Sequence, residues 1–248
     1  STHWWYQSTH RLIVDALRSR APRPSRIVDI GCGTGGLLAH LSPLGPVTAL
    51  EPSSVGFRLA RRRARTLPNV TVIQGGISAA AVFHDGSLDC VTCIDVLYHE
   101  HVQSWRGALR MFHRKLRPDG LLVLQVAAFP CLSGAHDRAV EGARRFQRVS
   151  LARVLHRLGF DLELCSHRFS WLFPGLCAAR NWNKLFKSAP REANDLTLFA
   201  RFPAPLQHAA QEVSLGVALA ENQLVLSGAC LPFGSSLFVL ARKRSEAC

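Results

Sequence analysis

The sequence contains 248 residues, of which 48% are apolar, and it carries a formal net charge of +13 at pH 7. This balance excludes a disordered or fibrous chain, and the length suits one large domain, or one domain with a modest addition. Apolar runs stay shorter than the roughly 18 to 20 residues that cross a bilayer. Because no basic and then apolar leader precedes the first tryptophans either, we expect a cytoplasmic protein.

Arginine supplies most of the positive charge. The segment FRLARRRARTL places five arginines on one expected helix, namely Arg58, Arg61, Arg62, Arg63 and Arg65. Such a helix can face phosphates, an anionic membrane surface or only solvent. Basic charge alone does not establish a nucleic-acid enzyme, so we expect no nucleic-acid partner, while peripheral contact with a membrane stays open.

Strand-like and helix-like segments alternate along the first 128 residues. In chain order the apolar spacing predicts helix 9–19, strand 26–30, helix 35–44, strand 47–52, helix 53–67, strand 69–76, strand 88–97, helix 104–116 and strand 121–128. This alternation predicts an α/β fold, a doubly wound parallel sheet with helices on both faces. In such sheets the ligand lies beyond the carboxyl ends of the strands.

After residue 150 the pattern becomes less regular. We expect a helix at 150–160 that ends at Gly159, a strand at 161–171 and a final strand at 235–244. Residues 174–232, between the last two strands, mix helix-like segments with proline breaks. They predict an insertion or lid rather than a separate domain.

The stretch RIVDIGCGTGGLLAHL joins the first predicted strand to the next helix. Its Gly31, Gly33 and Gly36 match G-x-G-x-x-G, a pattern that lets the backbone approach a nucleotide closely. Glu51 ends the next strand, where a carboxylate can accept hydrogen bonds from a ribose diol. These features fit a nicotinamide or flavin dinucleotide, and they also fit S-adenosylmethionine.

Asp29 discriminates between these two ligands. A dinucleotide would place a doubly anionic pyrophosphate over the loop, where a nearby carboxylate is unfavourable. S-adenosylmethionine has no phosphate and brings an ammonium and a sulfonium group, which Asp29 can attract. The pattern Val28-Asp29-Ile30-Gly31 therefore favours the methyl donor.

Four motifs in order resemble the class I S-adenosylmethionine-dependent methyltransferases. They are VDIGCGTGG, VTALEP, LDCVTCIDVLYH and LRPDGLLVL. The resemblance implies a Rossmann-like sheet with a C-terminal insertion, and S-adenosylmethionine as co-substrate. It also implies an N-terminal helical segment over the donor (1–24), a donor-binding core (25–165), and final strands with an acceptor lid (166–248).

Both ends are similar to a bacterial subgroup of that family. The segments HWWYQSTHRL, AAFPCLSGAHDRAVEGARRF and LPFGSSLFVLARK carry this similarity. The subgroup implies a small-molecule acceptor of natural-product or glycan pathways, and we favour oxygen over nitrogen or carbon. The subgroup usually has an arginine where this chain has Thr9, and Arg11 is a candidate substitute.

The donor-binding residues implied by the resemblance gather after the strands and at the N-terminus. They are Asp29, Gly31, Cys32, Gly33, Gly35, Glu51, Pro52, Gly76, Ile77, Asp95, Val96, Trp5, Tyr6 and Arg11. The rings of Trp5 and Tyr6 can pack over the sulfonium, or they can form a hydrophobic contact that stabilises the N-terminus of the first helix.

Histidines near the predicted acceptor side are candidates for a general base. His99 lies in YHEH after the fourth strand and His136 lies in GAHDR after the fifth. No third ligand of fixed position accompanies YHEH, so we predict no metal site. Alternative functions are a nucleic-acid methyltransferase, an NAD-dependent oxidoreductase and a catalytically inactive donor-binding module.

Overall fold

The computed structural model describes residues 3–20, 24, 26–132, 142–178 and 204–245. Within them, one sheet has the strand order β3-β2-β1-β4-β5-β7-β6. The strands are β1 (Ile27–Ile30), β2 (Val47–Glu51), β3 (Val70–Gln74), β4 (Leu88–Ile94), β5 (Leu116–Ala127), β6 (Phe160–Arg168) and β7 (Ser236–Lys243). The α-helices are α1 (Trp4–Arg20), α2 (Leu38–Leu41), α3 (Ser54–Ala64), α4 (Trp105–Lys115), α6 (Arg148–Arg157) and α8 (Ala204–Leu226), and short 3-10 turns are η1 (Ile77–Val82), η2 (Pro130–Leu132) and η3 (Ser170–Leu172).

Strands β1 to β5 pair in parallel, as their alternation with helices predicts. Strand β7 is different, since it lies antiparallel between β5 and β6. The reason is topological: β6 ends at the carboxyl edge of the sheet and β7 starts at that same edge, so β7 must run back. The doubly wound α/β fold is confirmed, and the expected parallel order holds for the first five strands.

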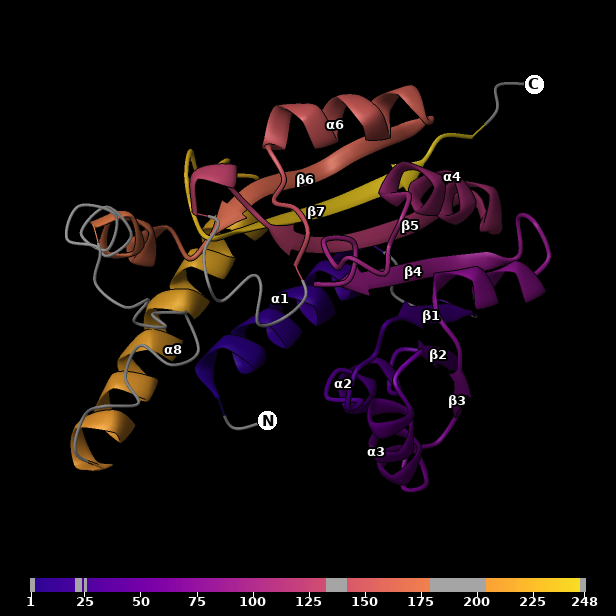
Figure 1. Ribbon diagram of the computed structural model, residues 1–248, viewed down its shortest axis with the longest axis horizontal. Helices are drawn as coiled ribbons and strands as arrows, with labels where there is room; N and C mark the ends of the chain where they lie inside the picture. Colours follow the sequence, from indigo (N-terminus) through magenta and orange to yellow (C-terminus); the bar gives the residue numbers. More distant parts are fainter. Residues whose placement is uncertain (1–2, 21–23, 25, 133–141, 179–203, 246–248) are drawn as a thin grey trace.

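Helices cover both faces of the sheet (Figure 1). Apolar side chains of α4 and α6 form one buried cluster with the sheet. Those of α1, α2, α3 and α8 form a second cluster on the opposite face. The two clusters give the sheet a continuous apolar core on either side, which leaves polar chemistry to its edges.

Several helix boundaries differ from the sequence prediction, and the differences at α1 and α2 have a clear structural cause. Helix α1 starts at Trp4, five residues early, because the Trp4 side chain is 1% exposed and packs edge-on against Phe169 at 5.4 Å. Helix α2 is only one turn, since Gly35 has a left-handed φ of +78° that a helix cannot contain. Helix α3 is capped by Ser53, whose side chain accepts from the Gly56 amide at 3.3 Å.

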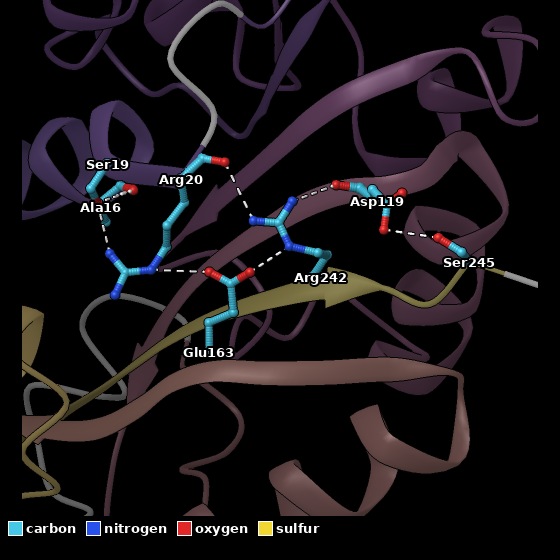
Figure 2. Close-up of polar contacts among 7 residues, drawn as sticks. All are labelled: Ala16, Ser19, Arg20, Asp119, Glu163, Arg242 and Ser245. Carbon is cyan, nitrogen blue, oxygen red and sulfur yellow. Dashed lines mark hydrogen bonds and ion pairs between the residues drawn. The ribbon is translucent and has the colours of Figure 1, made fainter.

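An ionic cluster fastens the C-terminal end of α1 to the sheet (Figure 2). Glu163 of β6 pairs with Arg20 of α1 at 3.0 Å and with Arg242 of β7. Arg242 also donates to the carbonyl oxygens of Arg20 at 3.3 Å and of Asp119 at 2.9 Å. The C-terminal end of α1 is therefore fixed to β6 and β7, the last two strands of the chain.

Helix α8 lies along α1 and contributes to the same face. Its Gln211 side chain accepts from the Trp4 amide at 3.2 Å. Of the helices in the described ranges, none is both long and apolar enough to cross a membrane.

Candidate active site

The glycine loop lies at the carboxyl edge, where β1, β2 and β4 end side by side. The amides of Gly31 and Cys32 both donate to the Leu50 carbonyl oxygen, at 2.8 and 3.0 Å. Gly31 and Gly33 have φ values of +71° and +56°, which favour glycine. A Cβ on Gly31 would lie 2.3 Å from a methyl of Val96, whereas a Cβ on Gly33 would meet no atom within 4 Å. The open approach to this loop is therefore at Gly33.

Glu51 links the loop to the start of α3. Its carboxylate is 7% exposed and accepts from the Gly33 amide at 2.7 Å and from the Ser53 amide at 2.9 Å. Pro52, the next residue, is exposed and lies close to Gly76, since a Cβ on Gly76 would be 3.9 Å from the Pro52 Cβ. A carboxylate has about four lone-pair sites. Two stay available on Glu51 for hydroxyl donors.

Asp29 lies buried beneath the loop and is 2% exposed. The Thr92 hydroxyl of β4 donates to its Oδ1 at 2.7 Å. Burial raises the pKa of Asp29 to about 6, the negative charge of Glu51 adds to this rise, and the Thr92 hydrogen bond opposes it. The ionised form of Asp29 is therefore costly in free energy, and a nearby cation would lower that cost.

The loop has neutral neighbours in Cys32 and Ile77, and a cationic neighbour in Arg63, whose Nη1 would lie 3.7 Å from a Cβ on Gly36. Burial, with the charges of Asp29 and Glu51, raises the pKa of the Cys32 thiol well above its usual range, so that the thiol stays protonated. Ile77 packs at the border of the apolar core on the face of α4. Negative charge at the loop therefore comes from two carboxylates.

The N-terminal turn of α1 lies beside this edge. Burial and the charge of Asp95 raise the pKa of Tyr6, and the ring of Trp5 lies 5.0 Å from that of Tyr6. The helix also approaches the loop, because a Cβ on Gly36 would lie 3.2 Å from the His10 ring. Arg11 is placed differently: it pairs with Asp15 at 2.8 Å, and its side chain is 63% exposed.

Asp95 and His99 follow β4 at the same edge. Asp95 adopts a left-handed φ of +57°, and its Oδ2 accepts from Gln125 Nε2 at 3.0 Å. The half-buried His99 ring lies 4.6 Å from that of Tyr98. The other predicted base, His136, lies outside the described residues.

A family model described as a methyltransferase domain matches residues 4–164, which contain the loop, Asp95 and α1. The chain belongs to this methyltransferase family. The resemblance found in the sequence is thereby confirmed.

Curated relatives match parts of the methyltransferase. It is 35% identical over 104 residues to the mitochondrial ubiquinone biosynthesis O-methyltransferase of Schizosaccharomyces pombe, covering 40% of this chain and 36% of the relative. It is 30% identical over 145 residues to the dTDP-3-amino-3,4,6-trideoxy-alpha-D-glucopyranose N,N-dimethyltransferase of Streptomyces venezuelae, covering 58% and 60%. The chain thus spans only part of the length of the relatives that it matches.

Solved structures share the fold of the methyltransferase. The YcgJ protein from Bacillus subtilis has a TM-score of 0.60 at 17% identity, covering 95% of this chain and 99% of that one. The [4+2]-cyclase SpnF has a TM-score of 0.59 at 18% identity, covering 96% and 82%. Since one of these structures is of a cyclase, the fold alone does not define the reaction.

Sequence reasoning missed several buried polar residues of the methyltransferase. Thr92, Gln125 and Arg168 are each 0% exposed and lie within strands β4, β5 and β6. The sequence signal of Thr92 and Gln125 is a single polar residue inside an apolar run, as in LLVLQVAA, whereas Arg168 lies in the polar stretch CSHRFS. Such residues need hydrogen-bond partners when buried, so they mark polar sites that apolar periodicity does not reveal.

Backbone strain also gathers at this edge. Asp95, Phe129 and Phe169 have φ values of +57°, +56° and +58° and follow β4, β5 and β6. A left-handed non-glycine residue costs about 1 to 3 kcal/mol and is found most often at functional sites. The carboxyl edge of the sheet, which is predicted to bind ligands, is thus the one where β4, β5 and β6 are followed by strained residues.

Proposed function

We propose that the protein transfers a methyl group from S-adenosylmethionine to a small-molecule acceptor, with oxygen favoured over nitrogen or carbon as the acceptor atom. The observation that carries this proposal is the buried Asp29 carboxylate beneath a loop that is open at Gly33. A pyrophosphate over that loop would add negative charge beside Asp29 and Glu51. A ligand with an ammonium and a sulfonium would instead relieve the cost of burying Asp29.

The residues of the loop match the space, charge and hydrogen-bonding groups of the donor. Gly33 leaves room for close approach, and Asp29 can attract the ammonium, directly or through water. Glu51 keeps lone pairs for ribose hydroxyls beside its two amide bonds. Pro52, Gly76, Ile77 and Val96 supply an apolar border for the adenosine.

The N-terminal segment is proposed to cover the donor. Tyr6 lies near enough to Asp95 for that charge to raise its pKa, which supports a position at the edge. The aromatic faces of Trp5 and Tyr6 would attract a sulfonium. The exposed pairing of Arg11 with Asp15 gives no support for a role of Arg11 in donor binding.

The bound donor supplies a methyl group already activated by its sulfonium. The task of this chain is then to align the acceptor with the methyl carbon and to exclude water, which removes much of the entropic barrier. For a hydroxyl acceptor, His99 is proposed to take the proton as the new bond forms. The lid expected at residues 174–232 is proposed to border the acceptor side; its residues 179–203 lie outside the described residues.

The relatives support a small acceptor without fixing its reacting atom. Two curated relatives at 35% and 37% identity are ubiquinone biosynthesis O-methyltransferases, and the relative at 30% identity is an N,N-dimethyltransferase of an amino sugar nucleotide. The first two favour oxygen. A natural-product or glycan intermediate is the acceptor class that we propose.

A transfer assay with labelled donor tests this function. The protein is incubated with methyl-labelled S-adenosylmethionine and either 3,4-dihydroxybenzoate or benzylamine, and labelled product is counted. Label on the hydroxylated probe supports the proposal, and label on the amine alone would correct the acceptor atom. Donor binding without transfer to any acceptor would favour an inactive binding module, and transfer to RNA or DNA would favour a nucleic-acid enzyme.

Paired histidine variants test the general base. His99→Ala should lower the turnover number by about 100-fold or more while donor affinity stays within two-fold. His101→Ala is the matched control, because His101 is exposed two residues further along the same segment. Equal turnover in the two variants would remove His99 as the base.

A further inference from the structure

A buried polar network joins four elements, β5, β6, α1 and α8, behind the predicted donor site. Its centre is Arg168, the last residue of β6, which is 0% exposed. The guanidinium donates to Gln125 Oε1 of β5 at 2.7 Å, to Asn222 Oδ1 of α8 at 2.8 Å and to Thr9 Oγ1 of α1 at 3.0 Å. Asn222 in turn donates to the Ser8 carbonyl oxygen at 2.7 Å.

Gln125 connects this network to Asp95 by two contacts. The Gln125 carbonyl oxygen accepts from the Asp95 amide at 2.8 Å, and Gln125 Nε2 donates to Asp95 Oδ2 at 3.0 Å. A guanidinium can only donate, so Arg168 orients the amide of Gln125 with its oxygen inward and its N–H groups toward Asp95. The left-handed backbone of Asp95 is held by the same residue.

The positive charge of Arg168 is balanced by carboxylates to which the guanidinium makes no direct hydrogen bond. Within the described residues, its guanidinium donates to neutral oxygens alone. Burial lowers the pKa of Arg168 to about 10, and the negative charges of Glu221 and Asp95 oppose this fall. Glu221 itself accepts from the Ser170 amide at 2.9 Å and from the Ser170 hydroxyl at 2.6 Å. Since a buried charge is costly without compensation, Asp95 and Arg168 stabilise one another through Gln125.

We propose that Arg168 and Gln125 are positioning residues for Asp95. They hold the Asp95 carboxylate in one orientation at the donor site, and they couple that orientation to the docking of α1 and α8 on the sheet. The inference rests on the proposed function and on the expectation from the sequence that Asp95 is one of the donor-binding residues. Donor affinity then depends on two side chains that do not touch the donor.

A thermodynamic cycle separates positioning from a general effect on folding. Calorimetry with S-adenosylhomocysteine is carried out on the unaltered protein, Gln125→Met, Asp95→Ala and the double variant. Gln125→Met removes the hydrogen bond to a charged group and should weaken binding by about ten-fold in the unaltered background. In the Asp95→Ala background the same substitution should change affinity by less than about two-fold, because the group that it positions is gone.

Two further variants keep the test independent of folding. Arg168→Lys retains the charge but cannot reach three partners in one plane, so it should give the same dependence on Asp95 as Gln125→Met does. Glu163→Gln is the control, because it weakens the attachment of α1 at its far end (Figure 2) and should leave affinity within about two-fold. Gln125→Glu, which can pair with Arg168, replaces Gln125→Met should the latter fail to fold.

The outcomes are distinguishable. An equal loss of affinity with and without Asp95, or no loss at all, would overturn this inference while the proposed function stands. Failure of the unaltered protein to bind S-adenosylhomocysteine would overturn the proposed function, and this inference with it.

Discussion

At the scale of single residues, Asp29 is placed at a cost to stability. Its pKa is raised from the usual 3.8 to about 6 by burial, so folding is penalised wherever the carboxylate is ionised. The protonated group has no such penalty, and its stability contribution is present below the unfolded pKa and lost as pH rises through 6. A cationic ligand bound at the loop above Asp29 would offset this cost.

Asp29→Asn should therefore stabilise the protein without ligand. The amide oxygen can keep the Thr92 hydrogen bond and carries no charge. A pKa change from 3.8 to about 6 corresponds to about 3 kcal/mol, so the unfolding free energy at pH 8 should rise by up to that amount and the gain should shrink toward pH 4. Urea denaturation at both pH values measures it. Equal or lower stability of the variant at pH 8 would show that the ionised Asp29 carboxylate does not destabilise the fold.

The glycines of the loop make a second residue-scale prediction. Gly33→Ala meets no atom within 4 Å and should cost only about 1 to 2 kcal/mol of stability for its positive φ. Gly31→Ala also drives a Cβ into Val96 and should cost about 2 to 4 kcal/mol. Yet Gly33→Ala should lose most donor affinity, because its methyl points into the open approach. Thermal unfolding and calorimetry together check this, and full affinity of Gly33→Ala would place the donor elsewhere.

At the scale of elements, α1 is held at both ends by polar contacts rather than by apolar packing alone. Arg168 contacts its first turns and Glu163 its last residue. Glu163→Gln should lower the unfolding free energy by about 1 kcal/mol, because the carboxylate is 22% exposed and partly screened by solvent. The loss should shrink in 1 M salt, where ion pairs are screened. Denaturation with and without salt measures it, and a loss independent of salt would exclude an ionic origin.

The sequence predicts the elements of this sheet well and the polar network poorly. Strands β1, β2, β4 and β5 are apolar runs bounded by turn residues, a pattern that local reasoning detects. The early start of α1 depends on Trp4 packing against Phe169, which lies 165 residues away in the chain. The positions of Gln125 and Arg168 likewise have meaning only once β5, β6 and α8 are in place. Long-range contacts of this kind leave no periodic signal in one sequence.

At the scale of the whole molecule, the positive charge is unevenly spread. Between Glu51 and Asp85 there is no acidic residue, and the arginines of α3 are exposed. We expect salt-sensitive retention on a heparin column, since clustered charges bind polyanions through released counterions. Replacing Arg58, Arg61 and Arg62 by glutamate should lower the eluting salt concentration more than the same change at Arg110, Arg153 and Arg157. Equal shifts would show that only net charge matters.

The sequence predicts one part of the proposed donor site and misses another. Asp29, Glu51 and the glycines lie at one edge because the carboxyl ends of parallel strands meet there, which spacing alone predicts. That Glu51 already binds two amides, and that Arg11 turns outward to Asp15, could not be predicted, because both depend on the exact path of the backbone.

The central claim is that the loop over Asp29 takes a cationic methyl donor and not a dinucleotide. Calorimetric titration of the unaltered protein with S-adenosylmethionine and with NAD at pH 8 tests it most directly. We predict binding of one S-adenosylmethionine per chain, an affinity that falls as pH drops through about 6, where Asp29 takes up its proton, and no measurable binding of NAD. Binding of NAD with no binding of S-adenosylmethionine would contradict the account.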